Sequence, residues 1–183
     1  MALDARIRYT KMVIVQSFTK LVREKPLNKI TVKEICDIAE INRATFYKYY
    51  MDVYDLLDKI EEQFLEELRE ILSSQKNETA KDVLTLIMVS FKAEQEKYEA
   101  IFSANGDSSF PQKVIEMCYD MDCALMKIEN KKLSQTQNEW LFRFIAQGCN
   151  GILNQWIAGG MKEPIYEVAD FTERLVKNAV STL

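Results

Sequence analysis

The chain has 183 residues, of which 48% are hydrophobic, 10% aromatic and 28% charged, and its formal net charge is −4. This is the composition of a globular protein with enough apolar material for a core, and it excludes a disordered, collagenous or low-complexity chain. The absence of histidine excludes Ser-His and Cys-His nucleophile pairs and every imidazole metal site.

Apolar residues recur at helical spacing through the first half of the sequence, and the whole chain holds only five glycines and three prolines. That scarcity predicts helices joined by short connections rather than a sheet with many tight turns. Thr31, Asn42 and Asp52 each precede a helical stretch and are predicted N-caps. The helices predicted for this half cover residues 3–23, Val32–Ile38, Arg43–Tyr49 and 52–74.

The second half continues the helical pattern. Asn105–Ser109 is its clearest predicted loop, and Gly159-Gly160 predicts a helix end. No alternating strand pattern and no internal repeat is present, so the sequence predicts an all-α protein. The predicted helices run from Thr79 to about Ser103, through Val114 to an end near Lys131, from Ser134 to about Ala158, and over Pro164–Thr182. Ser134 is a further predicted N-cap.

Charge is distributed unevenly along the chain. Residues 1–50 hold 10 Lys and Arg against 5 Asp and Glu, whereas residues 51–183 hold 14 against 23. A basic head on an acidic body is expected of a protein whose head meets a polyanion, and chance clustering of surface charge is the alternative. We therefore predict one domain over residues 1–50 and a second over residues 51–183.

Residues Ile30–Tyr50 encode a short helix, a turn and a second short helix rich in polar and aromatic groups. This is the pattern of a helix-turn-helix unit, whose second helix enters the major groove of DNA. Helix N-termini offer N–H groups to phosphates, and basic and hydroxyl side chains suit phosphates and base edges. The alternative is that Thr31 only caps its helix and that Lys33 and Lys48 are ordinary solvated lysines. The candidate DNA-binding residues are Thr31, Lys33, Asn42, Arg43, Ala44, Thr45, Tyr47 and Lys48. Phe46, by contrast, is expected to be a core anchor that holds the second helix against the first.

Several short motifs follow one another here: Thr31, Ile38-Ala39, Thr45-Phe46-Tyr47, Tyr49-Tyr50 and Leu56-Leu57. In order and spacing, this stretch resembles the DNA-binding domain of the tetracycline-repressor (TetR) family of bacterial transcription regulators. Three positions depart from the family pattern: Glu40 replaces a glycine, Met51 a frequent proline, and Val53 a phosphate-binding lysine. Further on, Gly148–Glu163 is similar to the penultimate helix and following turn of one subgroup of the family.

The resemblance implies a three-helix helix-turn-helix domain followed by a helical bundle for ligand binding and dimerisation. In this family a small effector held among the middle helices shifts the fourth helix and so changes the separation of two DNA-binding heads. Such coupling between effector and DNA is reciprocal. The candidate pocket residues, each of which also suits an ordinary core, are Phe91, Tyr98, Phe102, Met117, Met121 and Phe144.

Dimerisation is the second expectation for the body. Aromatic and small residues share one stripe of the helix from Ser134, and with the last helix they suit a four-helix interface between two subunits. The alternative is that these helices only complete the core. Two recognition helices about 34 Å apart require a near-palindromic operator. The candidate interface residues are Leu141, Gly148, Ile152, Trp156, Val168 and Leu175.

The leading hypothesis is a homodimeric, ligand-responsive repressor that binds double-stranded DNA. A second hypothesis is a helical partner-binding regulator with a degenerate DNA-binding head, which Glu40 and Val53 favour. A helical enzyme has little support, because no phosphate loop and no paired carboxylates on one helix face occur, so we expect no catalysis, cofactor or metal. The four scattered cysteines are expected to be reduced core thiols. With no predicted membrane span or secretory signal, we expect a cytoplasmic protein.

Overall fold

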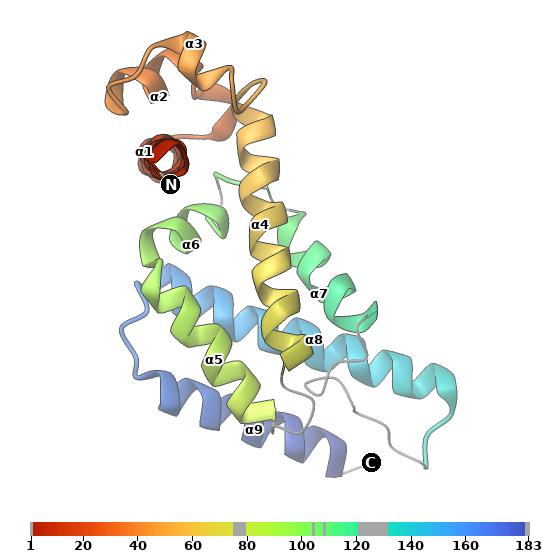
Figure 1. Ribbon diagram of the computed structural model, residues 1–183. Coiled ribbons are helices and arrows are strands. Elements are labelled where there is room, and N and C mark those ends of the chain that lie inside the picture. The colour runs from red at the N-terminus through yellow and green to blue at the C-terminus, as the bar shows by residue number, and fades with distance from the viewer. Residues whose placement is uncertain (1, 75–79, 104, 108, 121–131, 182–183) are drawn as a thin grey trace. The chain divides into compact units, whose positions relative to one another are not determined.

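The computed structural model describes residues 2–74, 80–103, 105–107, 109–120 and 132–181. The regular secondary structure of these residues is helical, which confirms the predicted all-α class (Figure 1). In this part of the chain no helix is long and apolar enough to cross a membrane. The helices are α1 (Ala2–Glu24), the 3-10 turn η1 (Leu27–Lys29), α2 (Val32–Ile38), α3 (Arg43–Phe46), α4 (Val53–Ser74), α5 (Ala80–Ala93), α6 (Gln95–Ile101), α7 (Phe110–Asp120), α8 (Gln135–Ala158) and α9 (Ile165–Ser181).

Two compact units divide the chain. The first comprises Met1–Phe64 and Glu96–Ser108, and the second comprises Leu65–Gln95 and Ser109–Leu183. The division therefore falls inside α4 rather than after residue 50, where the charge pattern placed it. It also assigns α6 to the same unit as α1, α2 and α3.

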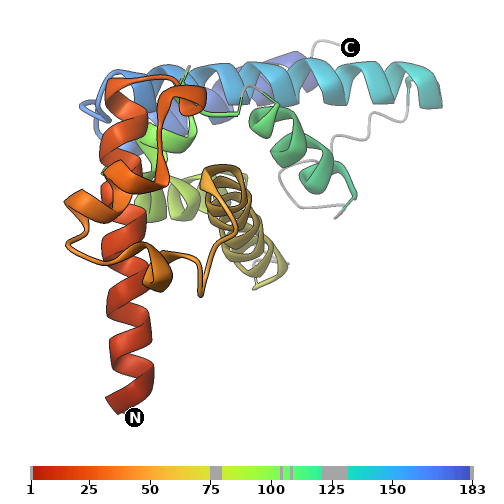
Figure 2. The same ribbon diagram turned by 90° about the horizontal axis from the view of Figure 1, so that it is seen from above.

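In the first unit, α2 lies against α1, and α3 lies against α2 (Figure 2). The segment that contains α6 joins them through Asn105, whose side-chain Nδ2 donates to the Val22 carbonyl at 2.9 Å. The Asn105 carbonyl in turn accepts from the Leu27 N–H at 3.2 Å, which fixes the connection between α1 and α2. The most deeply buried side chains of α1 to α4 in this unit are Ile14, Phe18, Val22, Ile35, Phe46 and Leu56.

In the second unit, α8 and α9 form a hairpin. Its turn requires left-handed backbone at Gly160, with φ of 81°, and at Met161, with φ of 53°. The Met161 N–H donates to the Trp156 carbonyl at 2.8 Å, and the Trp156 indole donates to the Glu163 carbonyl at 3.0 Å. Lys92 of α5 donates to the Met161 carbonyl at 2.8 Å, so α5 holds the turn from the other side. The predicted helix end at Gly159-Gly160 is confirmed.

The structure differs from two predicted helix boundaries. The long helix predicted for 79–103 is interrupted at Glu94, so that α5 buries its apolar face in the second unit and α6 buries Tyr98 in the first. Sequence periodicity continues through this point, because both helices are amphipathic. The helix predicted to reach Tyr49 ends at Phe46 and continues as a turn.

Candidate nucleic-acid interface

The turn between α2 and α3 orients the two helices of the predicted DNA-binding motif. Its Glu40 adopts φ of 53°, a conformation that glycine takes without strain and other L-residues do not. The Ile41 N–H closes the turn on the Cys36 carbonyl at 3.1 Å. The glutamate that departs from the family pattern therefore still forms the left-handed turn.

The N-terminus of α2 is closed by its own side chains. The Glu34 N–H donates to Thr31 Oγ1 at 3.3 Å, and the Glu34 carboxylate accepts from the Thr31 N–H at 3.0 Å, which makes the predicted capping box. The same carboxylate accepts from Lys25 Nζ at 2.6 Å. These hydrogen bonds lower the pKa of Glu34 to about 2, with Lys25 as the largest cause. A negative charge thus lies at a helix end where the sequence suggested a phosphate.

Asn42 and Thr45 are likewise engaged with each other at the start of α3. Asn42 Oδ1 accepts from the Thr45 N–H at 2.8 Å and from the Thr45 hydroxyl at 3.0 Å. This confirms the predicted N-cap. The polar atoms of both residues stabilise the helix end before any DNA is present.

The outward side of α3 and the following turn carries exposed side chains. The side chain of Tyr47 is 55% exposed, and Arg43, Ala44 and Lys48 are exposed as well. Phe46 is fully buried between them, with its ring 5.7 Å from that of Tyr47 and 5.5 Å from that of Tyr50. The predicted core anchor is confirmed. On α2, Lys33 is also exposed.

Sequence reasoning missed the contacts that fix α4 to the turn after α3. Lys59 Nζ donates to the Tyr49 carbonyl at 2.9 Å and to Asp55 Oδ2 at 2.9 Å, and it lies 5.4 Å from the Tyr50 ring centroid. Asp55 also accepts from the Met51 N–H at 2.8 Å. This backbone hydrogen bond, followed by Lys59, lowers the pKa of Asp55. The i,i+4 spacing of Asp55 and Lys59 was the signal in the sequence.

The predicted pocket residues that the structure describes are divided between the two units. Tyr98 and Phe102 pack in the first unit, with their rings 5.4 Å and 5.7 Å from the Phe64 ring. Phe91 and Met117 are buried in the second unit. Met121 lies outside the described residues.

Phe144 differs from the other predicted pocket residues that the structure describes, since it is 71% exposed on α8. Two predicted interface residues have the opposite placement: Leu141 and Trp156 are buried within their own chain. Leu141 packs against α9 through Val176. Ile152 is half-buried.

An open groove of about 560 Å³ marks the outward side of the α8–α9 hairpin. Gly148 and Gly151 form part of it, and a Cβ built on either would meet nothing within 4 Å. Val168 and Phe171 of α9 also line it. The large apolar side chains exposed on these two helices are Trp140, Phe144, Tyr166, Phe171 and Leu175. This concentration of apolar surface is typical of an interaction face.

Comparison with known proteins gives one family and a consistent fold. Residues 78–178 match the TetR-type family model described as the C-terminal region of a transcriptional regulator. A search of curated proteins finds no significant match.

Solved structures similar to this chain are themselves regulators. The TetR transcriptional regulator from Streptococcus agalactiae 2603V is 21% identical, with 96% of this chain and 98% of the other covered at a TM-score of 0.69. The dihydroxyacetone kinase operon activator DhaS is also 21% identical, with coverage of 95% and 97% and a TM-score of 0.66. FadR from Bacillus subtilis in complex with stearoyl-CoA is 17% identical, with coverage of 94% and 98% and a TM-score of 0.61.

Proposed function

The chain belongs to the TetR family of transcriptional regulators, and from this membership we propose that it acts as a homodimer that binds double-stranded DNA and responds to a small molecule. The role is one of binding rather than catalysis, as a repressor in the cytoplasm of a bacterial cell. The observation that carries the proposal is the outward side of α3.

That side presents the groups needed to read a duplex on a rigid support. Arg43 suits guanine or a phosphate, the small Ala44 permits close approach to a thymine methyl, and Tyr47 and Lys48 add a hydroxyl and a positive charge. Phe46 holds the helix from below, so these side chains are oriented before DNA binds. Thr31, Asn42 and Thr45 take the role of capping residues that position this surface.

The dimer is supported by the exposed face of α8 and α9. Gly148 and Gly151 are the places where a second α8 approaches most closely, and a two-fold axis perpendicular to α8 at that point makes the two copies of α8 antiparallel. Residue numbers in contact then add to about 299, so Phe144 of one copy meets Gln155 of the other, inside the groove. We therefore assign Phe144 to the proposed dimer interface and no longer to the pocket.

A small-molecule effector is the third element of the proposal. The Bacillus subtilis FadR structure holds stearoyl-CoA, and the buried aromatic and thioether side chains of Phe91 and Met117 give the second unit of this chain an apolar interior. An effector that favours a head separation unsuited to the operator releases DNA, and DNA weakens effector binding by the same factor.

One observation favours a second candidate function, a partner-binding regulator with weak affinity for DNA. The folded first unit, counted over 1–64 and 96–108, holds 12 Lys and Arg against 13 Asp and Glu. The excess positive charge of residues 1–50 is thus cancelled by α4 and α6. An almost neutral head gains little from the electrostatic attraction that dominates non-specific DNA binding.

A DNA-binding measurement separates the two candidates. Duplexes are selected from a random library at low salt with the purified protein, and their affinity is then measured for Arg43→Ala and Tyr47→Ala. Each substitution is expected to weaken specific binding by about 1–3 kcal/mol, since each removes a base or phosphate contact. Lys162→Ala, exposed beyond α8, is the control. Failure to select any sequence would favour the partner-binding candidate, and unchanged binding by both variants would contradict the docking of α3.

A further inference from the structure

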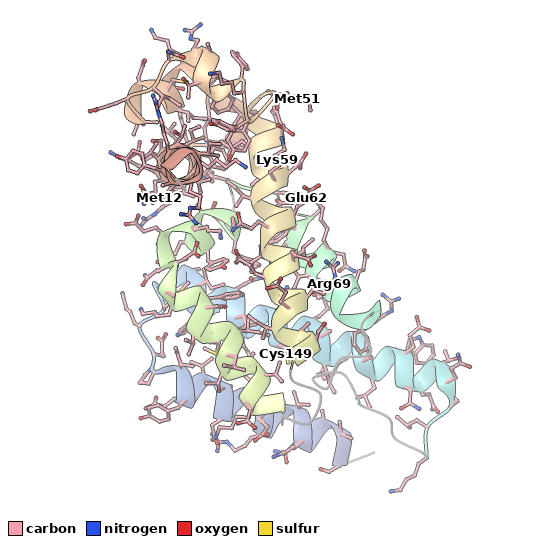
Figure 3. All side chains as sticks on the ribbon, viewed as in Figure 1. Met12, Met51, Lys59, Glu62, Arg69 and Cys149 are labelled. Carbon is pink, nitrogen blue, oxygen red and sulfur yellow. The ribbon has the colours of Figure 1, made fainter. Side chains whose placement is uncertain are left out.

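The first turn of α4 lies beside the surface that carries α3. Figure 3 shows Met51 at this end of α4 and Glu62 further along the same helix. Lys59, between them, bonds the Tyr49 carbonyl at 2.9 Å and so ties α4 to the turn after α3. A duplex held by α3 therefore passes close to the N-terminus of α4.

That N-terminus is occupied by carboxylates. Asp52 Oδ1 accepts from the Tyr54 N–H at 2.8 Å and from the Asp55 N–H at 2.9 Å. Asp55 is bonded to Lys59, but Asp52 and Asp58 are exposed and bear their charge toward solvent. Val53, which follows Asp52 in the sequence, is only 6% exposed, so its side chain is buried in the core.

We propose that Asp52 limits the DNA affinity of this chain, because its carboxylate takes the backbone N–H groups of α4 and sets a negative charge beside the bound duplex. The inference rests on the proposed DNA-binding function and adds to it an affinity-determining residue outside the recognition helix. A free helix N-terminus attracts phosphate through its N–H groups and its dipole, whereas a carboxylate already bonded there satisfies both and repels the phosphate.

The effect is local and electrostatic. Charges within a Debye length of about 8–10 Å interact at moderate salt, and more distant exposed charges are screened. Glu62 lies ten residues after Asp52, about 15 Å along the helix axis, and is exposed like it. The two carboxylates therefore differ in distance from α3 while sharing a helix and a charge.

The test compares Asp52→Asn with Glu62→Gln. Asparagine caps a helix as well as aspartate does, so Asp52→Asn removes the charge and keeps the cap. With a labelled duplex selected by the wild-type protein, Asp52→Asn is expected to bind about two- to fivefold more tightly at low salt. The gain should shrink as salt is added, and Glu62→Gln should bind as the wild type does.

Each outcome decides something. Equal affinity of Asp52→Asn and wild type, with intact binding by both, overturns the inference and leaves the DNA-binding function standing. Equal gains from Asp52→Asn and Glu62→Gln would also overturn it, since net charge alone would then explain the result. Absence of binding by all three proteins to any duplex overturns the proposed function and the inference together. Tight binding by Asp52→Asn alone supports the inference.

Discussion

Adjacent residues in the recognition segment have opposite roles. Phe46 is fully buried and Tyr47 is 55% exposed, although both are aromatic and both belong to the motif that carries the family resemblance. On a helix, consecutive side chains point about 100° apart, so one anchors the helix and its neighbour faces outward. The sequence predicted this division correctly for Phe46, whereas the role of Tyr47 in binding DNA stays a prediction.

Glu34 makes the stability of the head depend on pH. Its pKa falls from an ordinary value of 4.5 to about 2 in the folded chain. A lowered pKa contributes stability that is present above the unfolded value and is lost as the pH falls through the folded one. Glu34→Gln should therefore be less stable than wild type near neutral pH, with the difference vanishing as the pH approaches about 2.

Urea unfolding of wild type and Glu34→Gln across this range measures the difference. Glu62→Gln, at an exposed glutamate of α4, is the control for the loss of one negative charge. A constant gap between wild type and Glu34→Gln at every pH would contradict the role given to the Lys25–Glu34 pair.

At the scale of elements, the connections are set by short-range chemistry. N-caps at Thr31, Asn42 and Ser134 were predicted and are confirmed, because each depends only on residues three positions apart. The interruption between α5 and α6 was not predicted. It depends on which unit each apolar face joins, and no residue near Glu94 breaks a helix by itself.

The turn between α2 and α3 gives a prediction on stability. Glu40 has φ of 53°, which costs an L-residue about 1–2 kcal/mol. Glycine removes that cost but loses about 0.5–1 kcal/mol through the greater freedom of the unfolded chain. Glu40→Gly is therefore expected to stabilise the protein by up to about 1.5 kcal/mol.

Thermal or urea unfolding checks this result. Glu40→Ala serves as the matched control, because it removes the same charge and keeps the strain of a left-handed L-residue. Equal stability changes in Glu40→Gly and Glu40→Ala would show that charge, and not backbone conformation, governs the turn.

At the scale of the whole molecule, the exposed apolar face of α8 and α9 predicts self-association. Phe144 is 71% exposed there, and Leu86 is 41% exposed on α5, outside this face. Phe144→Glu buries an unpaired charge in the proposed interface and should weaken the dimer by about 2 kcal/mol or more. Leu86→Glu should leave it unchanged.

Sedimentation over a range of concentrations measures both variants against wild type. Circular dichroism establishes that each remains helical. A wild-type chain that is monomeric throughout would contradict the proposed dimer, and equal dissociation of both variants would contradict its location.

The sequence by itself determined the helical class, the caps, the motif of α2 and α3 and the end of α8, because these depend on spacings of a few residues. Only the tertiary structure decided which apolar side chains face inward. It buried Leu141 and Trp156 within the chain and left Phe144 outside, although all three share helical spacing. It also joined α6 and half of α4 to the head and so cancelled the basic charge of residues 1–50. Periodicity identifies an apolar stripe, but what covers that stripe depends on contacts between residues far apart in the chain.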